Sequence, residues 1–379
     1  MIYLDNAATS FPKPTCVIEE QTRCMRQYCG NPSRGSHALA MRAAQKIYDC
    51  RCEAAELFGV SNPEGVVFTM NTTMSINMLI KGLLRTGDHV LLSDMEHNSV
   101  YRPIYKLARE GRVSYDVFPT FPTDPARTAT DICRAIRSLI KPNTRLLIAA
   151  HASNICSATL PITEIGRLCA EHGVLFVVDA AQSAGHISIN MKESRIGALC
   201  VPGHKGLLGP QGCGLMLLSD GLHADTLMEG GSGFQSLSGE MPEEAPERYE
   251  AGTLPTPAIA GLCEGIRFVR SMGVAEIGAH AREMNQYLQE RLLEIPKVTV
   301  YTPHHVGSVL LFNVDGMSSD EVGDALNRRE ICVRTGFHCS ALGHATLGTT
   351  RLGGAVRVST GYATTKKHMD ALLRAVREL

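Results

Sequence analysis

The chain has 379 residues, of which 44% are hydrophobic and 20% are charged, and its formal net charge is −1. A chain of this length can bury a large core, and two domains are the usual arrangement; a charge so close to zero offers no general attraction to nucleic acid, so we expect no nucleic-acid partner. No apolar run reaches the roughly 18 residues needed to cross a bilayer and the first residues do not resemble a signal peptide, so we expect a cytoplasmic protein with no membrane partner.

The thirteen cysteines are an odd number in a long chain that lacks an export signal. Disulfide frameworks are typical of small secreted proteins. We therefore interpret most of these cysteines as reduced thiols. The cysteines and histidines also lack the spacing of zinc ligands, so we expect no metal site.

The first two thirds of the chain alternate short apolar runs with helical patterns, which is typical of βαβ units that build a parallel sheet. The expected strands are 65–69, 89–93, 113–118, 144–149, 174–179, 196–201 and 214–218. The expected helices between them include 75–84, 127–140 and 162–172. This pattern predicts an α/β fold with a mostly parallel sheet in a large domain.

The pattern changes after the breaker Leu254-Pro255-Thr256-Pro257, where a long helical region at 258–295 begins. More widely separated strands follow, expected at 298–301, 308–314, 331–334 and 356–359, with helices at 318–328 and 366–379. We predict a smaller α+β domain here. The expected division is an N-terminal segment that packs with the smaller domain, a large domain and the smaller domain itself: 1–14, 15–255 and 256–379.

Polar residues follow five of the predicted strands of the large domain. In open parallel sheets, ligands bind beyond the carboxyl ends of the strands, so these residues are expected to share one site. In chain order they are Asn71, Thr72 and Thr73; Glu96, His97 and Asn98; His151, Ser153 and Asn154; Asp179 and Gln182; and His204 and Lys205.

Lys205 lies in a glycine-punctuated run with apolar flanks. Burying an ammonium group is costly unless the group is paired, neutralised or used covalently. An ordinary surface lysine is the alternative interpretation. The hypothesis that we favour is a lysine that forms an imine with a carbonyl cofactor.

Three other positions supply complementary chemistry. Thr72 and Thr73 lie where a helix is expected to begin, which suits a phosphate, although a plain N-cap is the alternative. Asp179 ends a buried strand and would require a cation, such as a protonated ring nitrogen, while Gln182 can reach a neighbouring ring oxygen. An imine-forming lysine, an acid for a pyridinium and a phosphate site are together what pyridoxal phosphate requires.

The chain resembles, over essentially its whole length, the class V aminotransferase-like group of fold-type I pyridoxal-phosphate enzymes, and within it the cysteine desulfurases and selenocysteine lyases. The resemblance rests on motifs that occur in the family's order: Tyr3-Leu4-Asp5-Asn6-Ala7-Ala8-Thr9, Asn31-Pro32-Ser33-Arg34-Gly35-Ser36-His37, Thr72-Thr73, Glu96-His97-Asn98, Asp179-Ala180-Ala181-Gln182, Gly203-His204-Lys205, Arg248-Tyr249-Glu250-Ala251-Gly252-Thr253, Arg334-Thr335-Gly336-Phe337-His338-Cys339 and Arg357.

The resemblance implies a role for each matching residue. Lys205 would form the Schiff base, His97 would stack on the pyridine ring and Asp179 would pair with its nitrogen. The other cofactor contacts implied are Asn154 and Gln182 near the ring oxygen, Thr72, Thr73 and His204 at the phosphate, and Thr253 reaching it from the partner subunit of a homodimer. Arg357 would bind the substrate carboxylate, a task suited to a guanidinium group, with Asn6, Ala7 and His37 also at the substrate.

One position departs from the family's pattern. Relatives commonly have serine or threonine before the Gly-His-Lys motif, whereas this chain has Pro202. Proline has neither a hydroxyl nor a backbone N–H to donate to a phosphate. One cofactor contact is therefore in doubt, but the Schiff base is not.

Cys339 would decide the reaction. By the family's mechanism its thiolate attacks the sulfur of bound L-cysteine, which leaves a persulfide on Cys339 and L-alanine as product, and the sulfur then passes to an acceptor protein or a small thiol. Only roughly 3% of an unperturbed thiol is ionised at pH 7, so a nearby positive group is needed; His338, His344 and Arg334 are close in sequence. The alternative for Cys339 is a small apolar residue.

Other functions remain open at this point. Selenocysteine lyase activity on L-selenocysteine is the nearest alternative, followed by a class V aminotransferase or another C–S lyase. A non-catalytic, desulfurase-like scaffold that binds a sulfur carrier is the alternative outside enzymes.

Overall fold

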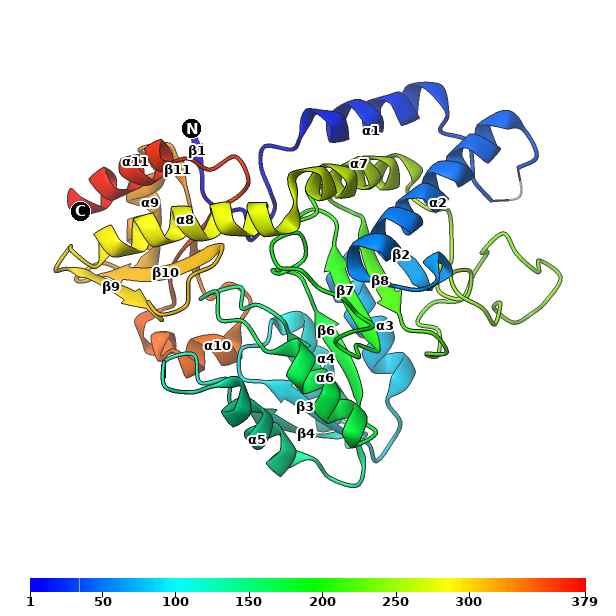
Figure 1. Ribbon diagram of the computed structural model, residues 1–379, viewed down its shortest axis with the longest axis horizontal. Coiled ribbons are helices and arrows are strands. Elements are labelled where there is room, and N and C mark those ends of the chain that lie inside the picture. The colour runs from blue at the N-terminus through cyan, green and yellow to red at the C-terminus, as the bar shows by residue number, and fades with distance from the viewer. Residues whose placement is uncertain (34) are drawn as a thin grey trace.

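The computed structural model describes residues 1–33 and 35–379; Arg34, part of one motif above, lies outside the described residues. Its larger sheet has seven strands in the order β2 (Val66–Thr69), β8 (Gly214–Leu218), β7 (Ala198–Pro202), β6 (Leu175–Asp179), β5 (Thr144–Ala150), β3 (His89–Ser93) and β4 (Ser114–Phe118) (Figure 1). β8 runs antiparallel to both of its neighbours, and the other described pairs are parallel. All seven predicted strands are present with ends shifted by at most two residues, and the α/β class is confirmed.

Helices cover both faces of this sheet because its strands are apolar on both sides. Successive residues of β3 show this, since Leu91 belongs to the core on one face and Leu92 to the core on the other. One face packs against α2 (Ala38–Phe58), α5 (Ala129–Leu139), α6 (Ile162–Glu171) and α7 (Thr256–Met272). The other face packs against α3 (Thr72–Leu83) and α4 (Asn98–Arg109).

The long helical region expected at 258–295 is two helices, α7 and α8 (Val274–Leu292). Gly273 separates them with φ of +88°, a conformation that residues with a Cβ rarely adopt. α7 packs against α2 and α1 (Thr15–Gln27), whereas α8 packs on the smaller sheet. The division of the chain near residue 256 stays a prediction.

The smaller sheet is antiparallel, with the order β12 (Arg334–Gly336), β13 (Ala355–Ser359), β10 (Val309–Val314) and β9 (Val298–Tyr301). One face packs against α8, α9 (Ser319–Asn327) and α11 (Lys366–Arg377). From the opposite face, Leu311 packs with Met95 and Ile155 of the large domain. The back of the smaller sheet therefore lies against the loops that follow β3 and β5.

The single strand expected at 331–334 is divided. β11 (Ile331–Cys332) pairs in parallel with β1 (Ile2–Tyr3), whereas β12 joins the smaller sheet. The loop after β12 leads into α10 (Ala341–Thr346), and single turns of 3₁₀-helix lie at Pro63–Gly65 and Thr349–Leu352. Within residues 1–33 and 35–379, no helix combines the length and apolar character needed to span a membrane.

Candidate active site

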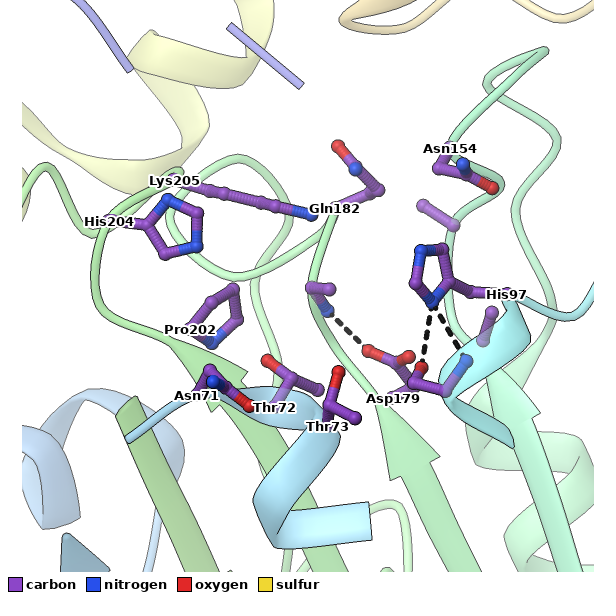
Figure 2. Close-up of a pocket in the computed structure, with 14 residues that line it drawn as sticks. Asn71, Thr72, Thr73, His97, Asn154, Asp179, Gln182, Pro202, His204 and Lys205 are labelled. Atoms are coloured by element: carbon purple, nitrogen blue, oxygen red, sulfur yellow. Dashed lines mark hydrogen bonds between the residues drawn. The ribbon is translucent and has the colours of Figure 1, made fainter. Parts of the chain in front are cut away.

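A pocket opens at the carboxyl ends of β5, β6 and β7 (Figure 2). It brings together eight residues that the sequence predicted to contact a cofactor, from five separate segments. They are Thr72, Thr73, His97, Asn154, Asp179, Gln182, His204 and Lys205. Pro202 also lines the pocket, next to Asn71 and Thr72 in Figure 2. The pocket thus lies where ligands bind in open parallel sheets, beyond the carboxyl ends of the strands, while the role of each residue stays a prediction.

The start of α3 forms one wall of the pocket. Asn71 caps this helix, since its side chain accepts a hydrogen bond from Met74 N at 3.0 Å. The next residue, Thr72, has a buried hydroxyl that finds no hydrogen-bond partner within the described residues. Unpaired backbone N–H groups and a free hydroxyl at a helix N-terminus are suited to an anion.

Asp179 is the last residue of β6 and is 3% exposed. One carboxylate oxygen accepts a hydrogen bond from Ala181 N at 2.9 Å. Burial raises the pKa of Asp179, although that hydrogen bond and the charge of Lys205 oppose the change. A cationic ligand atom next to this carboxylate would stabilise its ionised form.

Lys205 follows β7 and extends into the pocket (Figure 2). Burial lowers its pKa to about 8, and the positive charge of Arg357 acts in the same direction, while Asp179 partly offsets both. An amine with such a pKa is far more often neutral at physiological pH than an ordinary lysine, so it is a better nucleophile.

The backbone beside Lys205 is held by the N-terminal segment. The carbonyl of His204 accepts hydrogen bonds from Ser10 N at 3.0 Å, Thr9 Oγ1 at 3.1 Å and Lys13 Nζ at 2.9 Å. In contrast, Nδ1 of the His204 side chain has no partner within the described residues. Burial lowers the pKa of His204 to about 4, so its ring is neutral.

His97 lies across the pocket from Lys205 (Figure 2). It is the N-cap of α4, and its Nδ1 accepts a hydrogen bond from Ser99 N at 3.0 Å. Burial, followed by the charge of Lys205, lowers the pKa of His97 to about 4. The ring is therefore neutral, with its proton on Nε2, and presents an uncharged face to a ligand.

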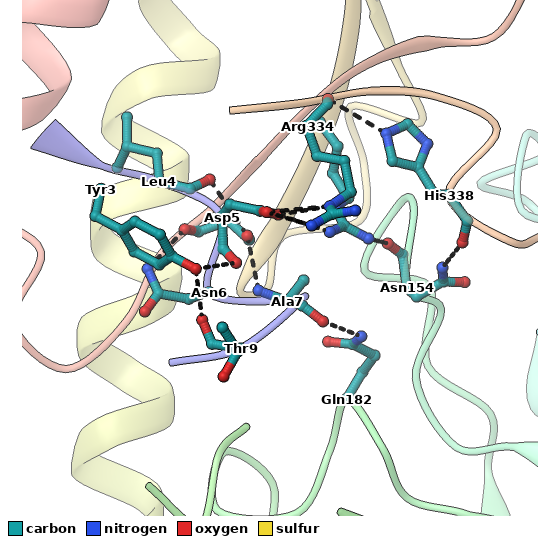
Figure 3. A network of polar contacts seen from close by, with 12 residues as sticks. Tyr3, Leu4, Asp5, Asn6, Ala7, Thr9, Asn154, Gln182, Arg334 and His338 are labelled. Carbon is teal, nitrogen blue, oxygen red and sulfur yellow. Dashed lines mark hydrogen bonds and ion pairs between the residues drawn. The ribbon is translucent and has the colours of Figure 1, made fainter. Parts of the chain in front are cut away.

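Next to the pocket, Asp5 lies between two arginines; we call Asp5, Arg334 and Arg357 the arginine cluster (Figure 3). Asp5 Oδ1 is 2.9 Å from Arg357 Nη2, and Asp5 Oδ2 is 2.9 Å from Arg334 Nη2. Arg357 is 3% exposed and also donates to Asn154 O at 3.1 Å. Arg357, the expected carboxylate ligand, is thus already paired, and it does not line the pocket itself.

Cys339 is exposed and lies in a turn, residues 337–340, which we call the cysteine loop; His338 and Ser340 of this turn are buried. Its backbone carbonyl accepts a hydrogen bond from Asn98 N at 2.7 Å, one residue beyond His97. The carbonyl of His338 accepts another from Asn154 Nδ2 at 2.7 Å (Figure 3). The cysteine loop is therefore attached to two segments that line the pocket.

The remaining predicted substrate and partner residues lie outside the pocket. Asn6 and Ala7 line an adjoining hollow that shares Gln182 and Lys205 with it, and Ala7 O accepts from Gln182 Nε2 at 3.0 Å. His37 and Thr253 are exposed, and His37 caps α2. Their assignments to the substrate and to a partner subunit stay predictions.

The sequence did not assign a role to Asp5 or Glu96. Asp5 is 329 and 352 positions from the two arginines that it binds, so no spacing rule connects them. Glu96 is buried and accepts at 2.9 Å from the backbone N of Ala150, which lines the pocket, and burial raises its pKa to about 8. The sequence placed Glu96 at the end of a predicted strand, among the residues expected to share the site, without giving it a role.

The cysteines show no disulfide, since all thirteen are free thiols and all lie within the described part of the chain. Within the same residues, no group of three or more histidine, cysteine and acidic side chains is placed to hold a metal ion.

A mostly parallel sheet covered by helices on both faces is typical of the fold-type I pyridoxal-phosphate enzymes. So are a lysine, an acidic residue and a helix N-terminus at the carboxyl edge of that sheet. The chain belongs to the class-V aminotransferase family, whose model matches residues 2–372. It is 33% identical to a probable cysteine desulfurase of Methanothermobacter thermautotrophicus, across all of this chain and 94% of that protein. It is 30% identical to a cysteine desulfurase of Salmonella agona, across 90% of this chain and 84% of that protein.

Solved structures agree with this assignment. A cysteine desulfurase from Thermococcus onnurineus superposes with a TM-score of 0.89 at 29% identity, covering 100% of this chain and 94% of that one. A cysteine desulfurase from Escherichia coli shares the fold, with a TM-score of 0.86 at 24% identity, over 99% of this chain and 94% of that one.

Proposed function

We propose that this chain is a homodimeric, pyridoxal-phosphate-dependent cysteine desulfurase. It would convert L-cysteine to L-alanine and carry the sulfur as a persulfide on Cys339 to an acceptor protein or small thiol. The observation that carries the proposal is the attachment of the cysteine loop beside the pocket through Asn98 N and Cys339 O, 2.7 Å apart. An exposed thiol beside a pocket with an imine-forming lysine suits sulfur transfer better than transamination, which needs no such thiol.

Pyridoxal phosphate fits the residues of the pocket. Thr72 Oγ1 and His204 Nδ1 are without partners within the described residues and suit its phosphate, while the buried carboxylate of Asp179 suits its ring nitrogen. Lys205 Nζ would bond to its carbonyl carbon. When bound, the cofactor supplies an electron sink for bond breaking at the substrate's Cα.

The protein's own groups would then do three things. Lys205, with its lowered pKa, would take the proton from Cα and, after the C–S bond has broken, return a proton to Cα so that alanine can form. His97, neutral and held by Ser99, would cover one face of the ring and exclude water. Arg357 would bind the substrate carboxylate, exchanging part of its contact with Asp5 for it.

Sulfur transfer would use Cys339 as the nucleophile. The Cys339 thiolate forms a new S–S bond with the substrate sulfur as the substrate's C–S bond breaks. The electron pair of the broken bond stays with the substrate carbon, which takes up a proton and leaves as alanine. The persulfide on an exposed loop is then accessible to an acceptor.

A comparison of two exposed cysteines tests this function. Alanine formed from L-cysteine is measured for the wild type, Cys339→Ser and, as a control, Cys29→Ser. We expect about a 100-fold or greater loss in Cys339→Ser and no loss in Cys29→Ser. If Cys339→Ser matches the wild type on cysteine, the persulfide mechanism is wrong.

L-selenocysteine serves as the second substrate in the same assay. A wild type that uses selenocysteine but not cysteine would identify a selenocysteine lyase. A purified protein that stays colourless after addition of pyridoxal phosphate would contradict the cofactor assignment.

A further inference from the structure

His338, in the cysteine loop, forms a buried pair with His344 of α10. His338 Nδ1 is 3.1 Å from His344 Nε2, and the two rings are stacked with centroids 5.3 Å apart. His344 Nδ1 is 2.6 Å from Thr349 Oγ1, and His338 Nε2 is 3.3 Å from the Arg334 carbonyl. His344 and Thr349 are fully buried and His338 is 8% exposed, so water does not compete for these contacts.

The donor and the acceptor of each hydrogen bond in this chain follow from the chemistry of the groups. Burial lowers the pKa of His338 to about 3 and that of His344 to about 4, so each ring is neutral, with one N–H and one lone pair. The carbonyl of Arg334 only accepts, so His338 donates to it through Nε2 and accepts through Nδ1. His344 then donates through Nε2 and accepts through Nδ1 from the Thr349 hydroxyl, whose contact with His344 O is longer, at 3.3 Å.

The backbone that carries the His338 ring is in an unfavourable conformation. His338 and Cys339 have φ of +49° and +54°, in the left-handed region that residues with a Cβ disfavour. Their carbonyls accept from Asn154 Nδ2 and Asn98 N, both at 2.7 Å. These two backbone contacts are made with the turn in this conformation, and the His338 ring of the same turn is hydrogen-bonded to His344.

We propose that His344, supported by Thr349, is a positioning residue for sulfur transfer. Through the ring of His338 it holds the cysteine loop in the conformation that attaches Cys339 beside the pocket. This inference rests on the proposed desulfurase function for its catalytic consequence. It assigns His344 and Thr349 no contact with the substrate or the cofactor.

Two variants of Thr349 test this role most directly. Valine keeps the shape of threonine and loses only the hydroxyl. Thr349→Val removes the donor to His344 Nδ1, whereas Thr349→Ser keeps it. For Thr349→Val we expect kcat for L-cysteine to fall about tenfold, with KM and the absorbance of the bound cofactor unchanged, because misplacing a reacting group by a fraction of an ångström slows the reaction. Thr349→Ser is expected to stay near the wild type.

His344 provides a second series, of which the leucine variant is the one at risk of misfolding. His344→Leu breaks both hydrogen bonds and is expected to reduce kcat by about 10-fold to 100-fold. An amide nitrogen in His344→Gln can replace the donor to His338, whereas His344→Asn is too short to reach it. We therefore expect glutamine to restore more of kcat than asparagine.

Amide hydrogen exchange measures whether the cysteine loop stays attached to α4, and it does not require catalytic turnover. Asn98 is the first residue of α4, so its N–H has no partner inside the helix and is protected by Cys339 O. In Thr349→Val we expect Asn98 to exchange about tenfold faster, while Ser99 N, which donates to His97 Nδ1, is unchanged. Single-residue fragmentation by mass spectrometry of the cofactor-loaded protein separates these two neighbours.

The outcomes separate this inference from the proposed function. A wild type that makes no alanine from cysteine contradicts the function, and exchange at Asn98 still decides whether the histidine pair holds the loop. If the wild type is active and Thr349→Val keeps both its kcat and its Asn98 protection, the inference is wrong. Faster exchange at Asn98 with an unchanged kcat also overturns it, since the loop position would then not matter for the reaction.

Discussion

The pocket and the arginine cluster adjoin each other but differ in how their charged groups are paired. In the pocket, Thr72 Oγ1 and His204 Nδ1 are buried without partners among the described residues. In the cluster, Asp5 binds Arg334 and Arg357, each at 2.9 Å. The pocket therefore leaves a hydroxyl and a ring nitrogen free for a ligand. In the cluster both guanidinium groups are ion-paired with Asp5, although Arg357 Nε has no partner among the described residues.

The pKa values follow the same contrast. Burial lowers the pKa of Lys205 to about 8, since no neighbouring acid fully compensates its charge. In the cluster, the hydrogen bonds that Arg334 donates to Asp5 raise the pKa of Arg334, whereas burial lowers the pKa of Arg357 although Asp5 opposes the change. Burial without full compensation favours the neutral, reactive form of Lys205, while the ion pair favours the charged form of Arg334.

Replacing Asp5, the acid shared by the two arginines, should have the largest effect, because both guanidinium groups then lose their ionic partner. In Asp5→Asn, the buried guanidinium of Arg357 loses its ionic partner. We expect the free energy of unfolding to fall by about 3 kcal/mol, measured by urea denaturation at pH 7. Asp124→Asn is the control, since it removes an exposed pair with Arg127 and should cost less than about 1 kcal/mol. Equal losses in the two variants would show that burial adds nothing to the cluster.

The pH dependence of the Lys205 amine tests whether burial without full compensation by an acid makes this amine reactive. The neutral amine is the nucleophile, so its fraction rises as pH increases through its pKa of about 8. Between pH 7 and pH 9 we expect the rate at which the cofactor-free protein binds pyridoxal phosphate covalently to rise about tenfold and then level off. Absorbance measures this rate, and Lys205→Ala is the blank. A rate that still climbs beyond pH 10 would indicate an ordinary lysine.

The smallest expected effect comes from replacing Pro202 by serine, which adds a hydrogen-bond donor beside the unpaired groups of the pocket. Pro202 lines the pocket near Thr72 and provides no hydroxyl or backbone N–H (Figure 2). We expect Pro202→Ser to bind pyridoxal phosphate roughly threefold to tenfold more tightly in a fluorescence titration, as one added hydrogen bond predicts. Pro125→Ser, an exposed site away from this pocket, should leave the affinity unchanged. No gain in Pro202→Ser would place the phosphate away from residue 202.

Much of the fold was predictable because its signals are local. Buried strands such as β3 and β6 are continuous apolar runs, and both were located from the sequence. The break at Gly273 and the division of 331–334 between two sheets were not predicted. A helical pattern continues across a single glycine, and the sheet that a short strand joins depends on residues far away in the chain.

The sequence by itself determined which chemical groups meet at the carboxyl edge of the sheet, because strand order and direction bring the ends of neighbouring parallel strands together. Lys205, Asp179 and His97 were placed in one pocket by this rule alone. Only the tertiary structure decided which of the charged groups are already paired. Asp5 reaches Arg357 across 352 positions and Asn98 at the start of α4 reaches the cysteine loop after β12, and such contacts follow from how separate elements pack rather than from any periodic pattern.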